Sequence, residues 1–144
     1  MPATPNSPVS PPRRPPVAVC REDLPELLAI AFDGLLEDPR AAAALLSEIE
    51  RAKVIDDGAT RPKLVRLGAE VIFRGARDAA SRCVKVVSPG EARGTTEAIS
   101  VLSPIGSGLI GLSEGQAILW EDRRGGYLEL EVLQVSFDPR ETRP

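Results

Sequence analysis

Residues 99–120 read ISVLSPIGSGLIGLSEGQAILW, and this stretch decides the fold. The apolar runs at 99–102 and 117–120 have the length and composition of β-strands. Between them lie Ser103-Pro104, a glycine-rich segment and the turn signal Glu114-Gly115. The pattern predicts two short strands joined by a compact, glycine-rich connection.

The same segment contains a literal G-x-G-x-x-G at Gly106, Gly108 and Gly111. In dinucleotide-binding proteins this fingerprint opens a crossover helix that is long enough to return to a parallel strand. Here the sequence breaks again at 113–115, so a βαβ unit does not fit. The glycines favour tight packing of a helix on a sheet, and residues 103–106 are also a candidate contact surface.

Further strand patterns surround this stretch, at 70–74, 83–87 and 127–137, and turn signals at 88–90 and 124–126 separate them. In the last strand the apolar alternation changes phase between Val132 and Leu133, which predicts a β-bulge or a strand buried on both sides. The fold class is therefore α+β. We expect a small, twisted, mostly antiparallel sheet packed against one short helix.

Two helices are predicted ahead of the sheet. Asp23 is a candidate N-cap for the first, with Pro25 in its first turn and Glu26 completing a capping-box pattern. Asp38-Pro39 starts the second, which ends at 56–58. The predicted apolar stripes are Leu24, Leu27, Leu28, Ala31 and Leu35 in the first helix and Ala42, Leu45, Leu46, Ile49 and Ala52 in the second. Two such helices with a short connection form an antiparallel hairpin, here only about 20 Å long.

Seven of the fourteen prolines lie in residues 1–16. Such a segment has few backbone donors and little apolar surface to bury, which predicts a disordered tail. We therefore divide the chain into a tail at 1–20, a helical hairpin at 21–58 and a C-terminal domain at 62–139. Ordered structure is expected to begin near Asp23.

Composition excludes several classes of site. The chain has no histidine, and its two cysteines, Cys20 and Cys83, do not form a C-x-x-C pair. A Cys/His zinc site, a Ser/His/Asp triad and a Cys/His dyad are therefore excluded, and we expect no metal and no cofactor. No apolar stretch is long enough to cross a bilayer and no secretion signal is present, so we expect no membrane partner and a reducing cytoplasm.

Charge is unevenly distributed, although the net charge is only -3. Residues 61–96 carry eight bases against three acids, and both flanking segments are acidic. This basic segment is either a solvated strand face or a weak nucleic-acid-binding patch. The candidate phosphate-binding residues are Lys63, Arg66, Arg74, Arg77, Arg82 and Lys85.

The order of parts in 99–120 resembles the C-terminal domain of the GreA/GreB transcription-factor family. A strand ends in Ser103-Pro104, a short Gly/Leu/Ile helix covers 105–112, an acidic turn covers 113–115, and a strand follows at 116–120. The short hairpin is similar to the Rnk-type branch, named for regulation of nucleoside diphosphate kinase. The resemblance extends over about residues 24–138. It implies an FKBP-like C-terminal domain and a coiled-coil N-terminal hairpin, without prolyl isomerase activity.

The resemblance also implies a non-enzymatic, monomeric regulator that binds bacterial RNA polymerase at the rim of the secondary channel. Its polymerase-binding residues would be Ser103, Pro104, Ile105 and Gly106. At the hairpin tip, Asp33, Glu37 and Asp38 are possible further contacts. Cleavage-competent relatives use tip carboxylates on a long hairpin to help hold magnesium. The short arm here favours a factor without transcript cleavage, with a cleavage-stimulating factor and a nucleic-acid-binding module as alternatives.

Overall fold

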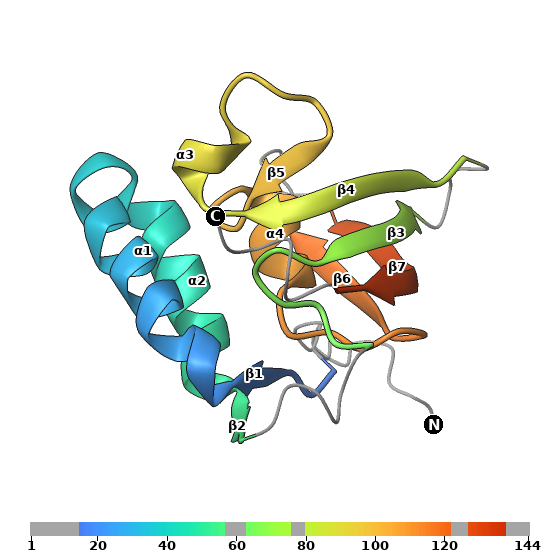
Figure 1. The fold of residues 1–144 in the computed structure, drawn as a ribbon, viewed down its shortest axis with the longest axis horizontal. Helices are drawn as coiled ribbons and strands as arrows, with labels where there is room; N and C mark the ends of the chain where they lie inside the picture. The colour runs from blue at the N-terminus through green and yellow to red at the C-terminus, as the bar shows by residue number, and fades with distance from the viewer. Residues whose placement is uncertain (1–14, 57–62, 76–79, 122–126, 138–144) are drawn as a thin grey trace, which may run out of the picture.

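The computed structural model describes residues 15–56, 63–75, 80–121 and 127–137. Figure 1 shows two helices on one side and a twisted sheet on the other, with a short helix between them. The fold class is α+β, as predicted. Among the described residues, no helix is both long enough and apolar enough to span a membrane.

The main sheet has five strands in the order β5-β4-β3-β7-β6. β3 and β4 pair antiparallel, as do β3 with β7 and β6 with β7, whereas β4 and β5 pair parallel. The strands are β3 (Glu70–Gly75), β4 (Arg82–Val87), β5 (Ala98–Ser100), β6 (Ala117–Glu121) and β7 (Tyr127–Ser136). All five overlap the predicted strands, but β5 ends at Ser100, so the predicted strand at 99–102 is too long at its C-terminal end, where residues 101–102 form a turn.

The predicted irregularity in the last strand is confirmed. Ile72 pairs with Gln134 and Phe73 pairs with Val132, so Leu133 is the extra residue of a bulge. The bulge changes which side chains face inward. Val132 is buried on one side of it and Val135 on the other, so the phase shift in the sequence keeps both in the core.

The two helices are α1 (Leu24–Glu37) and α2 (Pro39–Arg51), and we call them the helix pair. They lie side by side, and the chain reverses between them (Figure 1). Asp38 caps α2 as predicted, because its Oδ1 accepts a hydrogen bond from Ala41 N at 3.2 Å. Asp23 occupies the N-cap of α1 but makes no side-chain cap there, so the predicted capping box does not form. A 3₁₀ turn, η1 (Arg21–Asp23), precedes it.

The buried face of α1 differs from the predicted stripe. Leu27, Ala31 and Gly34 are buried, whereas Leu35 is 39% exposed. Gly34 is on the inner face because its missing side chain lets Leu102 approach closely. A Cβ on Gly34 would lie 3.0 Å from Leu102 Cδ1.

Ordered structure begins earlier than the predicted tail boundary of residue 20. Strand β1 (Ala18–Cys20) pairs parallel with β2 (Lys53–Ile55), and Val17 and Val19 are buried. The second helix correspondingly ends at Arg51, short of the predicted end at 56–58, because the next residues join this small sheet. The proline-rich composition obscured the alternating pattern of 17–20. Most of the predicted tail, residues 1–14, lies outside the described residues.

The two remaining helices are short, α3 (Pro89–Ala92) and α4 (Pro104–Leu109). Leu109 and Leu112 are fully buried and belong to the core. One cluster of buried apolar side chains contains residues of the helix pair, of the α4 region and of the sheet. The helix pair is therefore packed onto the rest of the fold through a shared core.

Candidate functional site

The connection from β5 to α4 contains the four residues singled out as a contact surface. Ser103 is the N-cap of α4. Its hydroxyl donates to Ser100 O at 2.7 Å and accepts from Gly106 N at 3.0 Å. Both hydrogen bonds of the hydroxyl are made inside the turn, so the Ser103 side chain stabilises the turn itself.

Gly106 is also required by the structure of the turn. A Cβ at this position would lie 2.1 Å from Ser100 O, closer than real Cβ atoms approach an oxygen. Gly106 is buried, whereas Pro104 and Ile105 are partly exposed. Ile105 also packs against the core. Of the four predicted contact residues, Pro104 is thus the one whose side chain has no internal role beyond starting the helix.

The three candidate tip residues, Asp33, Glu37 and Asp38, are all exposed. Asp38 caps α2, and the side chains of Asp33 and Glu37 form no hydrogen bond or ion pair within the described part of the chain. In the described part of the chain, acidic and cysteine side chains form no group of three or more that could hold a metal ion. The tip therefore presents separate carboxylates rather than a preformed cation site.

The turn at Ser103 and the end of α1 are neighbours. Leu102, which directly precedes the turn, lies against Gly34 in the last turn of α1. Further contacts join α2 to α4. The structure thus places the end of α1, close to the predicted tip, beside the loop that leads into the predicted turn. The sequence predicted the tip and the turn as separate sites. The apolar pattern of one helix does not show which distant loop packs against its glycine.

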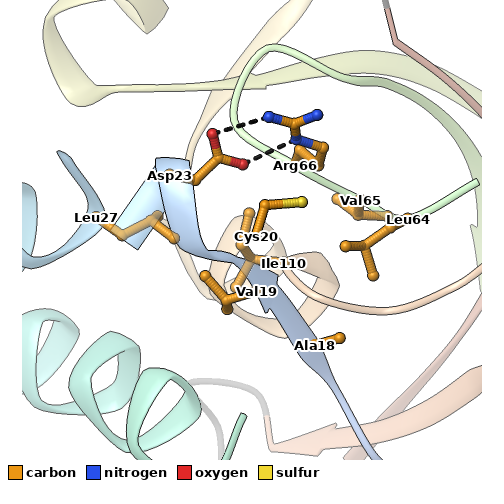
Figure 2. A pocket seen from close by; sticks show the side chains of 9 residues that line it. All are labelled: Ala18, Val19, Cys20, Asp23, Leu27, Leu64, Val65, Arg66 and Ile110. Carbon is orange, nitrogen blue, oxygen red and sulfur yellow. Dashed lines mark hydrogen bonds and ion pairs between the residues drawn. The ribbon is translucent and has the colours of Figure 1, made fainter. Parts of the chain in front are cut away.

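A buried arginine fixes the start of the helix pair to the sheet. Figure 2 shows Arg66 facing the Asp23 carboxylate above a small apolar pocket that has essentially no room for a ligand. Arg66 Nε donates to Asp23 Oδ2 at 2.9 Å, and one terminal nitrogen donates to Asp23 Oδ1 at 3.1 Å and to Glu22 Oε1 at 2.9 Å. The guanidinium also lies 4.1 Å from the ring centre of Phe137. We call this arrangement the Arg66 clamp.

Electrostatics within the clamp favour the charged form of Arg66. Burial acts to lower the pKa of Arg66, but hydrogen bonding and the negative charge of Asp23 outweigh it, so this pKa is raised above its usual value. The clamp was missed in the sequence because its partners lie 43 and 44 residues apart. It also explains why Asp23 does not cap α1.

The candidate phosphate-binding residues that the structure describes all have interactions within the protein. Apart from Arg66, Lys63 pairs with Glu114 at 3.1 Å and Arg74 pairs with Glu131 at 3.2 Å. Arg82 lies 5.5 Å from the ring centre of Phe73. Of the other two, Lys85 also has an interaction, and Arg77 lies outside the described residues.

Glu114, the partner of Lys63, also binds the backbone of β7. Its Oε2 accepts a hydrogen bond from Val135 N at 2.9 Å, and its Oε1 faces Lys63. The hydrogen bond from Val135, followed by that from Lys63, lowers the pKa of Glu114. The acidic turn that follows α4 is thereby held against β7.

Comparison with known proteins shows the family of this chain. The family model "Transcription elongation factor, GreA/GreB, C-term" matches residues 60–137. The chain belongs to the GreA/GreB family. The matched region contains the five-stranded sheet, the Ser103 turn and α4.

Individual relatives agree with this assignment. The chain is 32% identical over 119 residues to the "Regulator of nucleoside diphosphate kinase" of Escherichia coli (strain K12), covering 79% of this chain and 88% of that protein. It is 37% identical over 89 residues to the "Transcription elongation factor GreA" of Psychrobacter arcticus, covering 60% of this chain and 55% of that protein. Among solved structures, a "Prokaryotic transcription elongation factor GreA/GreB from Nitrosomonas europaea" has a TM-score of 0.66 at 30% identity, covering 86% of this chain and all of that one.

Proposed function

We propose that this GreA/GreB-family protein binds bacterial RNA polymerase at the rim of the secondary channel and regulates transcription without stimulating transcript cleavage. The observation that carries the proposal is the family match across 60–137, which includes the Ser103 turn. In this proposal the sheet and α4 form an FKBP-like docking domain and the helix pair acts as a short coiled-coil hairpin. The protein acts as a cytoplasmic monomer and has no enzymatic activity of its own.

The geometry of the turn supports docking, because some of its residues hold the backbone and another is exposed for contact. Ser103 and Gly106 hold the backbone through hydrogen bonds inside the turn. Pro104 is partly exposed at the first position of α4, where its ring presents a rigid surface that lacks a donor. We therefore assign the direct contact to Pro104 and the neighbouring part of Ile105, and the shaping of the turn to Ser103 and Gly106.

Helix length argues against transcript cleavage. α1 has 14 residues and α2 has 13. At 1.5 Å rise per residue, an arm of this size spans only about 20 Å. A carboxylate must come within about 2 Å of a magnesium ion to bind it directly. A short arm with Asp33 and Glu37 at its end stops well before a catalytic centre that a long hairpin is needed to reach.

The proposal is tested by capturing core polymerase with purified protein and adding a GreA-type factor as competitor. Wild type should retain polymerase, and the competitor should displace it. Pro104→Glu should lose most of the binding while staying folded, because a glutamate at the first position of a helix is compatible with the helix dipole. Retention of polymerase by this variant at the wild-type level would place the docking surface elsewhere.

Cleavage is measured separately, with backtracked elongation complexes and magnesium. We expect no shortening of the transcript above the polymerase background. Strong cleavage that depends on Asp33 or Glu37 would support the alternative of a cleavage-stimulating factor. The nucleic-acid-binding alternative is disfavoured because each candidate phosphate-binding side chain that the structure describes already has an interaction within the protein.

A second candidate function follows from one relative. The Escherichia coli protein that covers 79% of this chain is named as a regulator of nucleoside diphosphate kinase. A corresponding role here would change the activity of that kinase on direct addition of the purified protein. An unchanged rate at a molar excess of this protein would exclude direct regulation and leave the polymerase proposal intact.

A further inference from the structure

The outer side of α1 carries an apolar patch that the fold leaves uncovered. Phe32 is 56% exposed, Leu35 39% and Leu36 91%. They account for three of the four exposed large hydrophobic residues among the described side chains, and all lie near the end of one helix. Their spacing of three and four residues places them next to one another on the helix surface. We call these three residues the α1 patch.

The α1 patch is not part of the contact between the two helices. Leu27, Ala31 and Gly34 form the inner face of α1 and are buried. Leu36 lies half a turn away from Gly34, which places it on the opposite side of the helix. α1 is thus apolar on two sides, whereas the exposed positions of α2 include Arg40, Ser47 and Glu50. Clustered exposed apolar side chains of this kind mark interaction surfaces more often than isolated ones do.

Charge around the patch identifies the kind of partner. Asp33, Glu37 and Asp38 are exposed beside it, and Arg40 is the nearest exposed base along the chain. A symmetric contact between two copies would bring these carboxylates together, and an anionic lipid surface would repel them. A protein groove with an apolar floor and a rim of lysine or arginine satisfies both features.

We propose that the α1 patch docks into a basic-rimmed apolar groove on RNA polymerase, as a second contact beside the Pro104 turn. This inference rests on the proposed function, since it names a further part of the same interface. The contact of Leu102 with Gly34 fixes the end of α1 relative to the loop that leads into the turn. Phe32 and Leu36, each two residues from Gly34, lie on the opposite side of the helix from this contact.

The test is a titration of core polymerase with wild type and with the double variant Phe32→Gln/Leu36→Gln. Leu119→Gln is the control, because Leu119 (41% exposed) is the fourth exposed large hydrophobic residue among the described side chains and lies on β6, outside the patch. The double variant should bind about 30-fold or more weakly, as expected for loss of a hot spot. The control should bind within about 3-fold of wild type. All three proteins should have the same thermal unfolding midpoint, because the substituted side chains are exposed.

A second variant, Asp33→Asn/Glu37→Gln, tests the charged rim. It should weaken binding by about 3- to 10-fold at low salt and reduce the salt dependence, since screened ion pairs would be lost. Unchanged affinity of the Phe32/Leu36 variant overturns the inference but leaves the proposed function standing, provided that wild type binds and a GreA-type factor competes. Failure of wild type to bind overturns both. A dimer in solution that the Phe32/Leu36 change disperses would also overturn it, by assigning the patch to a second copy.

Discussion

Replacing Arg66 with methionine tests the clamp that joins the helix pair to the sheet. Methionine keeps most of the volume over Phe137 but removes three hydrogen bonds to two carboxylates. Loss of one partner from a buried ion pair costs about 3–5 kcal/mol. The Arg66 side chain is 8% exposed and that of Asp23 is 16% exposed, but that of Glu22 is 64% exposed and contributes little. We therefore expect a loss of about 3 kcal/mol in the free energy of unfolding.

Urea denaturation of a double-mutant cycle checks this value. Arg66→Met and Asp23→Asn should each destabilise the protein, and the double variant should lose less than the sum, with a coupling of about 1–3 kcal/mol. Glu22→Gln is the control and should cost less than about 1 kcal/mol. The midpoint of thermal unfolding should fall by roughly 10 °C for Arg66→Met, at 2–4 °C per kcal/mol for a chain of this size. Additive effects, or an Arg66→Met protein within 0.5 kcal/mol of wild type, would refute the reasoning.

Three further outcomes follow from the fold. Gly106→Ala should lower stability by about 3 kcal/mol or more, since its Cβ would meet a backbone oxygen, whereas Gly90→Ala, with nothing within 4 Å, should stay within about 1 kcal/mol in the same denaturation assay. Deleting residues 1–19 removes the buried Val17 and Val19, so circular dichroism should show a markedly lower melting temperature; an unchanged melting temperature would show that β1 contributes nothing. The pKa of Glu114 is lowered in the folded state, so its contribution to the free energy of unfolding is present at neutral pH and is lost as pH falls through that pKa. Glu114→Gln should therefore make the fall in stability at acid pH shallower than in wild type. The same fall in both proteins would contradict the Val135 hydrogen bond.

The predictable parts of this protein are those that short-range patterns determine. The five main strands were located because period-two alternation and glycine or proline turns are local signals. The cap at Asp38 was predicted for the same reason, since its acceptor and donor are three residues apart. The bulge at Leu133 was visible as a change of phase within one strand.

The missed parts depend on contacts between distant residues. β1 and β2 have three residues each, and the whole helix pair lies between them in the sequence, which leaves no local signal of their pairing. The Arg66 clamp joins residues 43 apart. In α1, both sides of the helix are apolar, and contacts with distant residues, such as the packing of Leu27 and Ala31 in the shared core and the approach of Leu102 to Gly34, determine which side is buried. For the candidate site, the sequence indicated the 103–106 turn but not that two of its residues, Ser103 and Gly106, hold the turn itself.

Equilibrium binding to core RNA polymerase tests the central claim most directly. Cys83 is exposed and Cys20 is buried, so a thiol-reactive fluorophore should label Cys83 selectively. Fluorescence anisotropy of the labelled protein should then rise to saturation as core polymerase is added, and an unlabelled GreA-type factor should reverse the rise. Anisotropy that stays flat up to micromolar polymerase, or a saturable signal that no excess of the competitor reverses, would contradict binding at the secondary channel.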